Sequence, residues 1–172
     1  MSKTLVLGGI RSGKSALAEQ CAAAQSAVIY VATAGAGDGE MQARIDQHRA
    51  RRPAAWGLVE EPLALGQVLA QHASAAPCLL IDCMSLWVSN LLHAGEQAFA
   101  EQRAAWLQAV ADYPGALVIV SNEVGLGLVA MDPLSRRFCD ELGWLNQALA
   151  ERCDRVLMSV AGLPWVLKGA PL

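Results

Sequence analysis

TLVLGGIRSGKSALAE, residues 4–19, is the stretch that decides the fold of this chain. Its first four residues form a short apolar run, which is typical of a buried strand. Residues 8–15, GGIRSGKS, match the P-loop pattern G-x-x-x-x-G-K-[ST], and the residues after them are good helix formers. A strand, a glycine-rich loop and a helix in this order predict a loop that binds phosphate groups.

Four positions of this loop have an expected chemical role. Gly8 and Gly13 lack a β-carbon, so the backbone can turn and direct its N–H groups at one phosphate chain. Lys14 is expected to reach the terminal phosphates, and the hydroxyl of Ser15 to ligate Mg²⁺. The alternative is a glycine-rich turn that meets the pattern by chance, which the strand–loop–helix context disfavours. We therefore predict that the chain binds a nucleoside triphosphate.

The composition limits the class of protein. A length of 172 residues predicts a single domain, 1–172, with a core of its own. The apolar fraction is 54%, but no apolar run reaches the length of about 18 residues that a membrane span needs. The net charge of −3 argues against nucleic acid as the main partner. The five cysteines are scattered and no signal peptide precedes the first strand, so we expect reduced thiols in a cytoplasmic protein.

A second ligand loop is expected at residues 33–39, TAGAGDG, because they follow the apolar strand 27–32. Loops at the carboxyl ends of parallel strands hold ligands in α/β sheets, although this one could also be a simple connector. The next segment, 40–52, is expected to be a helix that stops at Pro53.

His48 stands in that segment among four arginines, Arg44, Arg49, Arg51 and Arg52. One interpretation is a solvated basic face of a helix. The other is a phosphate site beside the P-loop, because guanidinium groups present a planar fork of donors to phosphate. Repulsion from the arginines should keep the imidazole neutral and leave one ring nitrogen free to act as a nucleophile.

Asp82 ends the third predicted strand, 77–82, after four apolar residues. This is the usual form of the second carboxylate of P-loop proteins, which orients Mg²⁺. The pattern is weak alone, but beside a P-loop it predicts that Asp82 belongs to the metal shell. The fourth strand, 116–120, runs into residues 121–127, SNEVGLG, whose polar residues and glycines again mark the ligand edge.

The remaining segments complete an α/β alternation of strands and helices. A short strand is expected at 56–59 and a helix from Glu60 to about Ala73, with acidic residues at its amino end as the helix dipole prefers. Further helices are expected over 84–92, 98–112 and 133–152, and the last strands over 156–160 and 165–167. Trp87 is expected in the core or an interface, and His72 and His93 at the surface or at helix ends.

These stretches together resemble one family, the bifunctional adenosylcobinamide kinase and adenosylcobinamide-phosphate guanylyltransferases of cobalamin biosynthesis. The matching stretches, in the order of the family, are GGIRSGKS (8–15), VIYVATA (28–34), EMQARIDQHRARRP (40–53), LLIDCMSLWVSNLL (79–92), SNEVGLG (121–127) and GWLNQALA (143–150). They span nearly the whole chain, and their combination is far more specific than the P-loop, which alone would indicate only an NTPase.

The resemblance implies a P-loop NTPase fold of the RecA-like kind, a three-layer α/β domain with a mostly parallel sheet, assembled as a homotrimer. It implies two reactions. ATP or GTP phosphorylates the aminopropanol hydroxyl of adenosylcobinamide, and GTP then transfers GMP to that phosphate with release of pyrophosphate. The second reaction passes through a GMP–histidine intermediate. The nucleophile of the family lies in the stretch R-I-x-x-H-x-x-x-R-P, which here places it at His48.

The resemblance also implies a set of nucleotide and metal contacts. The nucleotide contacts fall on Gly8, Gly9, Ile10, Arg11, Ser12, Gly13, Lys14, Ser15, Thr33, Ala34, Gly35, Arg49, Ala50, Arg51, Arg52, Glu60 and Asp82. Mg²⁺ would be held by Ser15 and Asp82. One departure is Trp144, where some relatives carry arginine, so a corrinoid contact made by that arginine in those relatives would differ in this chain.

Two other functions fit parts of the pattern. An ordinary P-loop kinase of a small metabolite would leave His48 without a role. A GTP-dependent switch should carry an N-K-x-D motif that reads guanine, and the sequence has none. The products distinguish the three, because a switch gives only GDP and phosphate, a kinase gives a phosphorylated acceptor, and a guanylyltransferase gives pyrophosphate.

Overall fold

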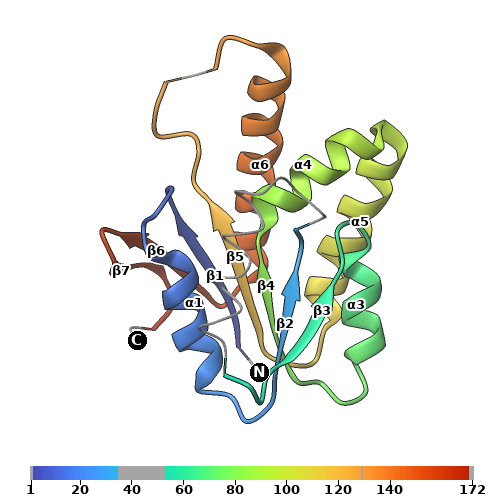
Figure 1. Ribbon diagram of the computed structural model, residues 1–172, viewed down its shortest axis with the longest axis vertical. Coiled ribbons are helices and arrows are strands. Elements are labelled where there is room, and N and C mark those ends of the chain that lie inside the picture. The colour runs from blue at the N-terminus through green and yellow to red at the C-terminus, as the bar shows by residue number, and fades with distance from the viewer. Residues whose placement is uncertain (1, 35–52, 129, 171–172) are drawn as a thin grey trace.

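The computed structural model describes residues 2–34, 53–128 and 130–170 (Figure 1). Seven strands in this part form one sheet in the order β3-β2-β4-β5-β1-β6-β7. Their bounds are β1 Lys3–Gly8, β2 Val28–Ala32, β3 Gly57–Glu60, β4 Cys78–Asp82, β5 Leu117–Asn122, β6 Arg155–Val160 and β7 Leu163–Lys168. All neighbours are parallel except the hairpin β6–β7. The predicted, mostly parallel sheet is confirmed.

The helices lie on both faces of this sheet (Figure 1). They are α1 Lys14–Ala23, α3 Leu65–His72, α4 Met84–Ala94, α5 Glu96–Asp112 and α6 Pro133–Arg152. Helix α1 packs on one face, while α4 and α6 pack on the other, with α3 and α5 on the same side. The three layers predicted from the sequence are therefore present. No helix of the described residues has the length and apolarity to cross a membrane.

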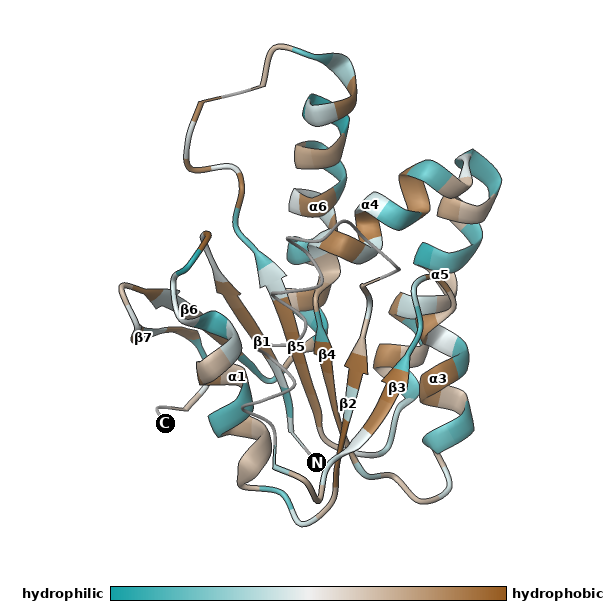
Figure 2. Ribbon diagram, in the orientation of Figure 1, coloured by the Kyte–Doolittle hydropathy of each residue, from teal (hydrophilic) through white to brown (hydrophobic). Residues whose placement is uncertain are grey.

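The central strands bury both of their faces. Leu79 and Ile81 of β4 belong to the core beneath α3–α6, whereas Leu80 between them belongs to the core beneath α1. Strand β5 alternates in the same way, with Leu117 and Val118 on opposite faces. Burial on both sides is the reason that these strands are continuous apolar runs, which Figure 2 shows as the brown centre of the sheet.

The amino end of α3 differs from the prediction. Glu60 does not begin the helix, because it is the last residue of β3, paired in register with Ala32 of β2. The helix begins at Leu65, and the carboxylate of Glu61 accepts the N–H groups of Leu63 and Ala64 at 2.8 and 2.7 Å. The expected acidic group near the helix start is thus present, but pairing across the sheet moves the helix five residues along the chain.

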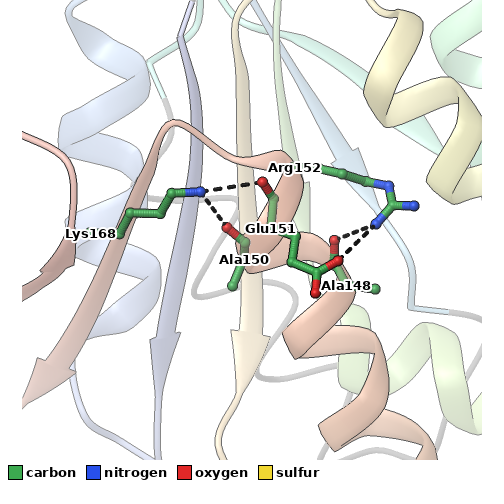
Figure 3. Close-up of polar contacts among 5 residues, drawn as sticks. All are labelled: Ala148, Ala150, Glu151, Arg152 and Lys168. Atoms are coloured by element: carbon green, nitrogen blue, oxygen red, sulfur yellow. Dashed lines mark hydrogen bonds and ion pairs between the residues drawn. The ribbon is translucent and has the colours of Figure 1, made fainter.

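The bounds of α6 agree with the predicted range. At its amino end the side chain of Asp132 accepts the N–H of Ser135, with a proline in the first turn. At its carboxyl end Lys168 of β7 donates to the carbonyl oxygens of Ala150 and Glu151 at 2.8 and 3.3 Å (Figure 3). A cation there satisfies carbonyl groups that the helix leaves unpaired, so the β6–β7 hairpin is fixed to the helical layer.

Candidate active site

The P-loop joins the carboxyl end of β1 to the amino end of α1, and its two expected glycines are required by the geometry. A β-carbon on Gly8 would lie 2.3 Å from Ser12 Oγ and 2.9 Å from the carbonyl oxygen of Ser159. Gly13 has a φ of 92°, in the left-handed region that favours glycine. The predicted strand–loop–helix arrangement is therefore confirmed.

Residues from distant parts of the chain hold the P-loop backbone. The carbonyl oxygen of Ser12 accepts the N–H of Gly162 at 2.8 Å and the hydroxyl of Ser159 at 2.7 Å. On the other side, the N–H of Glu123 donates to the carbonyl oxygen of Gly8 at 3.1 Å. The loop is thus clamped between β5 and the β6–β7 hairpin. The sequence gives no signal for Ser159 or Gly162, because their contribution depends on strand order.

The side chains of the P-loop differ in exposure and in contacts. Lys14 donates from Nζ to the carbonyl oxygen of Gly9 at 3.1 Å, so its ammonium group lies across the loop. Ile10 and Arg11 are exposed at the tip, and Ser15 is half-buried in the first turn of α1. The structure brings together all eight P-loop residues that the sequence predicts. The ammonium group of Lys14 lies against the loop.

Asp82 ends β4, two strands from the P-loop strand β1. Its Oδ2 accepts the hydroxyl of Tyr30 at 3.0 Å. Burial and the Asp82 carboxylate raise the pKa of the neighbouring Cys83 thiol, and the charge of Lys14 opposes that rise. Asp82 and Lys14 therefore both lie within electrostatic reach of the Cys83 sulfur atom, near the carboxyl ends of the strands.

The donors at this edge fit a bound magnesium ion. Among the residues that the structure describes, no group of three or more His, Cys, Asp or Glu side chains could hold a metal by themselves. Mg²⁺ in nucleotide sites needs only one or two protein oxygens, because phosphate and water oxygens complete its shell. The hydroxyl of Ser15 and the carboxylate of Asp82 are oxygen donors of this kind.

Thr33 connects the ends of β2 and β4. Its fully buried hydroxyl donates to the carbonyl oxygen of Cys83 and accepts the N–H of Cys83, both at 2.8 Å. Asn90 of α4 donates to the carbonyl oxygen of Thr33 at 2.9 Å. Thr33 and Asn90 thus fix the backbone next to Asp82 and Ala34. Asn90 is a positioning residue that the motif analysis did not single out.

Glu60 also lies at the carboxyl end of its strand, but far from the P-loop. Its strand β3 is four positions from β1, which at about 4.8 Å per strand corresponds to about 19 Å. Within the described residues, the structure therefore does not bring Glu60 together with the P-loop. The other predicted site residues, Gly35, His48, Arg49, Ala50, Arg51 and Arg52, and the predicted helix 40–52 lie outside the described residues.

A pocket of about 710 Å³ lies beside the P-loop between α4 and α6. Its wall combines apolar and polar side chains, including Ile10, Ser89, His93, Glu123, Leu134 and Phe138. Its volume falls within the range of small-molecule sites. The predicted ligand edge after β5 contributes Glu123 here, but the walls from α4 and α6 have no signal in the sequence, because they meet only in the folded chain.

The isolated histidines and Trp87 are placed as the sequence predicts. His72 is the last residue of α3, and His93 lies exposed in the last turn of α4. His93 also lines the pocket, with Nδ1 at 2.7 Å from the carbonyl oxygen of Ser89. Trp87 is buried in the core and donates from its indole N–H to the carbonyl oxygen of Leu63.

Comparison with known proteins identifies the family. A family model described as cobinamide kinase / cobinamide phosphate guanyltransferase matches residues 4–167. The chain belongs to this family. The resemblance carried by the sequence motifs is thereby confirmed, and the interpretations as an unrelated small-metabolite kinase or as a switch GTPase are not supported.

Curated relatives of the cobinamide kinase / guanyltransferase family match over the full length. The chain is 56% identical to the bifunctional adenosylcobalamin biosynthesis protein CobP of Pseudomonas aeruginosa over 172 residues, which cover 99% of each chain. It is 36% identical to the bifunctional adenosylcobalamin biosynthesis protein CobU of Escherichia coli K12, covering 92% of this chain and 96% of that relative.

Solved structures that resemble this family member confirm the RecA-like P-loop fold. The RadB recombinase aligns with a TM-score of 0.50 at 15% identity, covering 91% of this chain and 73% of that one. An ATPase of a type III secretion system aligns with a TM-score of 0.56 at 14% identity, covering 96% and 56%. At such low identity these likenesses show the fold alone.

Proposed function

We propose that this chain catalyses two successive reactions of adenosylcobalamin biosynthesis. In the first, ATP or GTP phosphorylates the hydroxyl group of adenosylcobinamide. In the second, GTP transfers GMP to adenosylcobinamide phosphate, which gives adenosylcobinamide-GDP and pyrophosphate. The observation that carries the proposal is the family match over residues 4–167, together with a P-loop whose geometry is intact.

Phosphoryl transfer would use the groups around the P-loop. Its backbone N–H groups, from Gly8 to Ser15, would surround the phosphates, and Lys14 would move from the Gly9 carbonyl oxygen to the terminal phosphate oxygens. Ser15 and Asp82 would hold Mg²⁺, which neutralises charge on the phosphates when it is bound. Because the clamp on Ser12 and Gly8 is already formed, the loop needs little rearrangement to bind nucleotide.

Guanylyl transfer would use His48 as the nucleophile. A ring nitrogen attacks the α-phosphorus of GTP, a phosphorus–nitrogen bond forms, and the bond to the leaving pyrophosphate breaks. A phosphate oxygen of adenosylcobinamide phosphate then displaces the histidine. The surrounding arginines, Arg49, Arg51 and Arg52, suit this step because they favour the neutral imidazole and offset charge that develops on the phosphate.

The remaining predicted contacts would bind other parts of the nucleotide. Ala34, Gly35 and Ala50 are positions that the family resemblance assigns to nucleotide binding. Glu60, at about 19 Å from the P-loop strand, could only meet the nucleoside end of a nucleotide whose phosphates lie on the P-loop. The Thr33 hydroxyl is occupied by its two hydrogen bonds to the backbone of Cys83, through which it would position the end of β4. Any direct contact of Thr33 with the nucleotide would come from its backbone.

A homotrimer of these subunits, acting in the cytoplasm, is part of the proposal. Strand β7 is an outer strand of the sheet, at the end opposite β3 in the strand order, and Leu163, Trp165 and Leu167 on one of its faces are 70%, 61% and 47% exposed. An exposed apolar edge strand favours association with another chain. Light scattering of the purified protein at micromolar concentration should give three times the mass of the 18.2 kDa subunit. A monomer mass would refute this part of the proposal.

Product analysis tests the two activities together. The protein is incubated with adenosylcobinamide, ATP, GTP and Mg²⁺, and the corrinoid and phosphate products are separated. We expect adenosylcobinamide phosphate to form first, then adenosylcobinamide-GDP with one pyrophosphate for each corrinoid converted. Phosphorylated corrinoid without any pyrophosphate would instead support a kinase alone, and nucleoside diphosphate without a modified corrinoid would contradict both reactions.

A further inference from the structure

We propose that Glu123 is the general base of the kinase reaction and that the pocket between α4 and α6 receives the alcohol-bearing arm of the acceptor. Nothing in the motif analysis gave Glu123 a role. The inference rests on the kinase activity proposed above, and it adds the group that accepts the proton of the reacting hydroxyl.

The backbone fixes Glu123 next to the phosphate site. It follows β5, which is the strand beside β1, and its N–H donates to the carbonyl oxygen of Gly8 at 3.1 Å. Gly8 is the first residue of the P-loop, and Ile10 from the tip of the loop lines the same pocket as Glu123. Glu123 therefore lines the pocket from a strand end that is hydrogen-bonded to the start of the P-loop.

The carboxylate of Glu123 is held by one oxygen only. Oε1 accepts the N–H of Gly125 at 2.8 Å, while Oε2 makes no hydrogen bond to any residue in the described part of the chain. The strand end beneath it is fixed by α6, because Asn146 accepts the hydroxyl of Ser121 at 2.6 Å and donates to the carbonyl oxygen of Asn122 at 3.0 Å. An oriented carboxylate with one open oxygen is suited to accept a proton from a bound alcohol.

The wall of the pocket suits an amphipathic arm. Leu134 and Phe138 of α6 and Leu92 of α4 supply apolar surface, while Ser89 and Ser135 supply hydroxyl groups. A whole corrinoid is larger than about 710 Å³, so the pocket would take only the arm that ends in the hydroxyl, with the macrocycle outside. The reacting oxygen would then lie in the part of the pocket that Glu123 and Ile10 of the P-loop both line.

The proposed step balances without any further reactant. The O–H bond of the acceptor breaks and its proton passes to Oε2 of Glu123. The alcohol oxygen forms a bond to the γ-phosphorus, and the bond between that phosphorus and the β–γ bridging oxygen breaks, with its electron pair leaving on the nucleoside diphosphate. Glu123 later releases the proton to water.

Asp82 and His93 are the other candidates for this base, and the structure favours Glu123 over both. Asp82 lies on β4, one strand farther from the P-loop strand, and its Oδ2 is bonded to Tyr30. His93 lies at the end of α4, exposed, with its Nδ1 engaged at Ser89. Of the three, Glu123 alone is joined to the P-loop backbone by a hydrogen bond within the described residues.

Glu123→Gln tests the inference with little change of shape. The amide oxygen of glutamine can still accept the N–H of Gly125, so the turn that orients the side chain is retained. We expect kcat of the kinase reaction to fall by about 100-fold or more, the scale of general base catalysis. The KM for nucleotide should stay within about twofold. Transfer of GMP to supplied adenosylcobinamide phosphate should also stay within about twofold, because that acceptor has no proton to lose.

Two further variants sharpen the result. Glu101→Gln, on the exposed face of α5, is the control for the substitution itself and should keep both activities. Leu134→Trp, at the mouth of the pocket, should raise the KM for adenosylcobinamide by about tenfold without changing the KM for nucleotide.

Three outcomes would overturn the inference. The first is a kinase kcat of Glu123→Gln within about threefold of the wild type. The second is an equal loss of both reactions, which would show a structural role. The third is an unchanged acceptor KM in Leu134→Trp, which would exclude the pocket. If the wild-type protein itself has no kinase activity, the proposed function fails, and the inference fails with it.

Discussion

Two regions of the same sheet edge are organised differently. Around β1 and β5, the P-loop backbone is fixed by bonds from Glu123, Ser159 and Gly162, and Lys14 already lies across it. Around β2, the hydroxyl of Thr33 fixes the end of the strand to Cys83 after β4, and the predicted phosphate-binding groups of this side, His48 and the arginines beside it in the sequence, lie outside the described residues. The groups for phosphoryl transfer are therefore arranged by the fold, whereas those proposed for guanylyl transfer are concentrated in the connection between β2 and β3.

This difference has a consequence for the two reactions. Both need a triphosphate bound at the P-loop, but only guanylyl transfer needs an enzyme nucleophile. Substitutions around β1 should therefore affect both reactions. The exception is Glu123, the proposed base for the alcohol proton, whose substitution should affect the kinase reaction alone. Substitution of His48, between β2 and β3, should affect guanylyl transfer alone.

Lys14→Ala should have the largest effect on both reactions. Loss of its charge leaves the terminal phosphates without their cation, so both rates should fall by several orders of magnitude. Steady-state assays of each reaction against the wild type measure this. If either reaction of Lys14→Ala stays near the wild-type rate, the two reactions do not share the P-loop.

Asp82→Asn should act through the metal. The substitution keeps the size of the side chain and can still accept from Tyr30, but it removes the charge that attracts Mg²⁺. We expect half-maximal activity to require about ten times more Mg²⁺ in both reactions, with Asp140→Asn, exposed on α6, as the control. Superimposable Mg²⁺ titrations of mutant and wild type would remove Asp82 from the metal shell.

Gly8→Ala should have a smaller effect, on stability as well as on nucleotide binding. Its β-carbon would meet the backbone oxygen of Ser159 at 2.9 Å, so the clamp must open, at a cost of about 1–3 kcal/mol. Gly9→Ala is the matched control in the same loop, because nothing lies within 4 Å of its β-carbon position, and its stability should match the wild type. Urea unfolding of the two variants measures the difference, and equal midpoints would show that the clamp is not rigid.

The parts of the fold that the sequence predicts are those with local signals. The P-loop, the apolar strands and the bounds of α6 follow from short patterns of residues. The predicted start of α3 at Glu60 was wrong, because Glu60 pairs with β2 and this pairing outweighs the preference of glutamate for the amino end of a helix. The clamp from Ser159 and Gly162 and the pocket between α4 and α6 arise from strand order and helix packing, which no local pattern contains.

The most direct test of the account is covalent labelling of the protein by GTP labelled on the α-phosphate. The account predicts that the wild type retains label after treatment with base and loses it after mild acid, as a phosphorus–nitrogen bond should. His48→Ala should take up no label, lose guanylyl transfer, and still phosphorylate adenosylcobinamide. Stable labelling of His48→Ala, or guanylyl transfer at the wild-type rate without His48, would contradict the division between the two regions of the sheet edge.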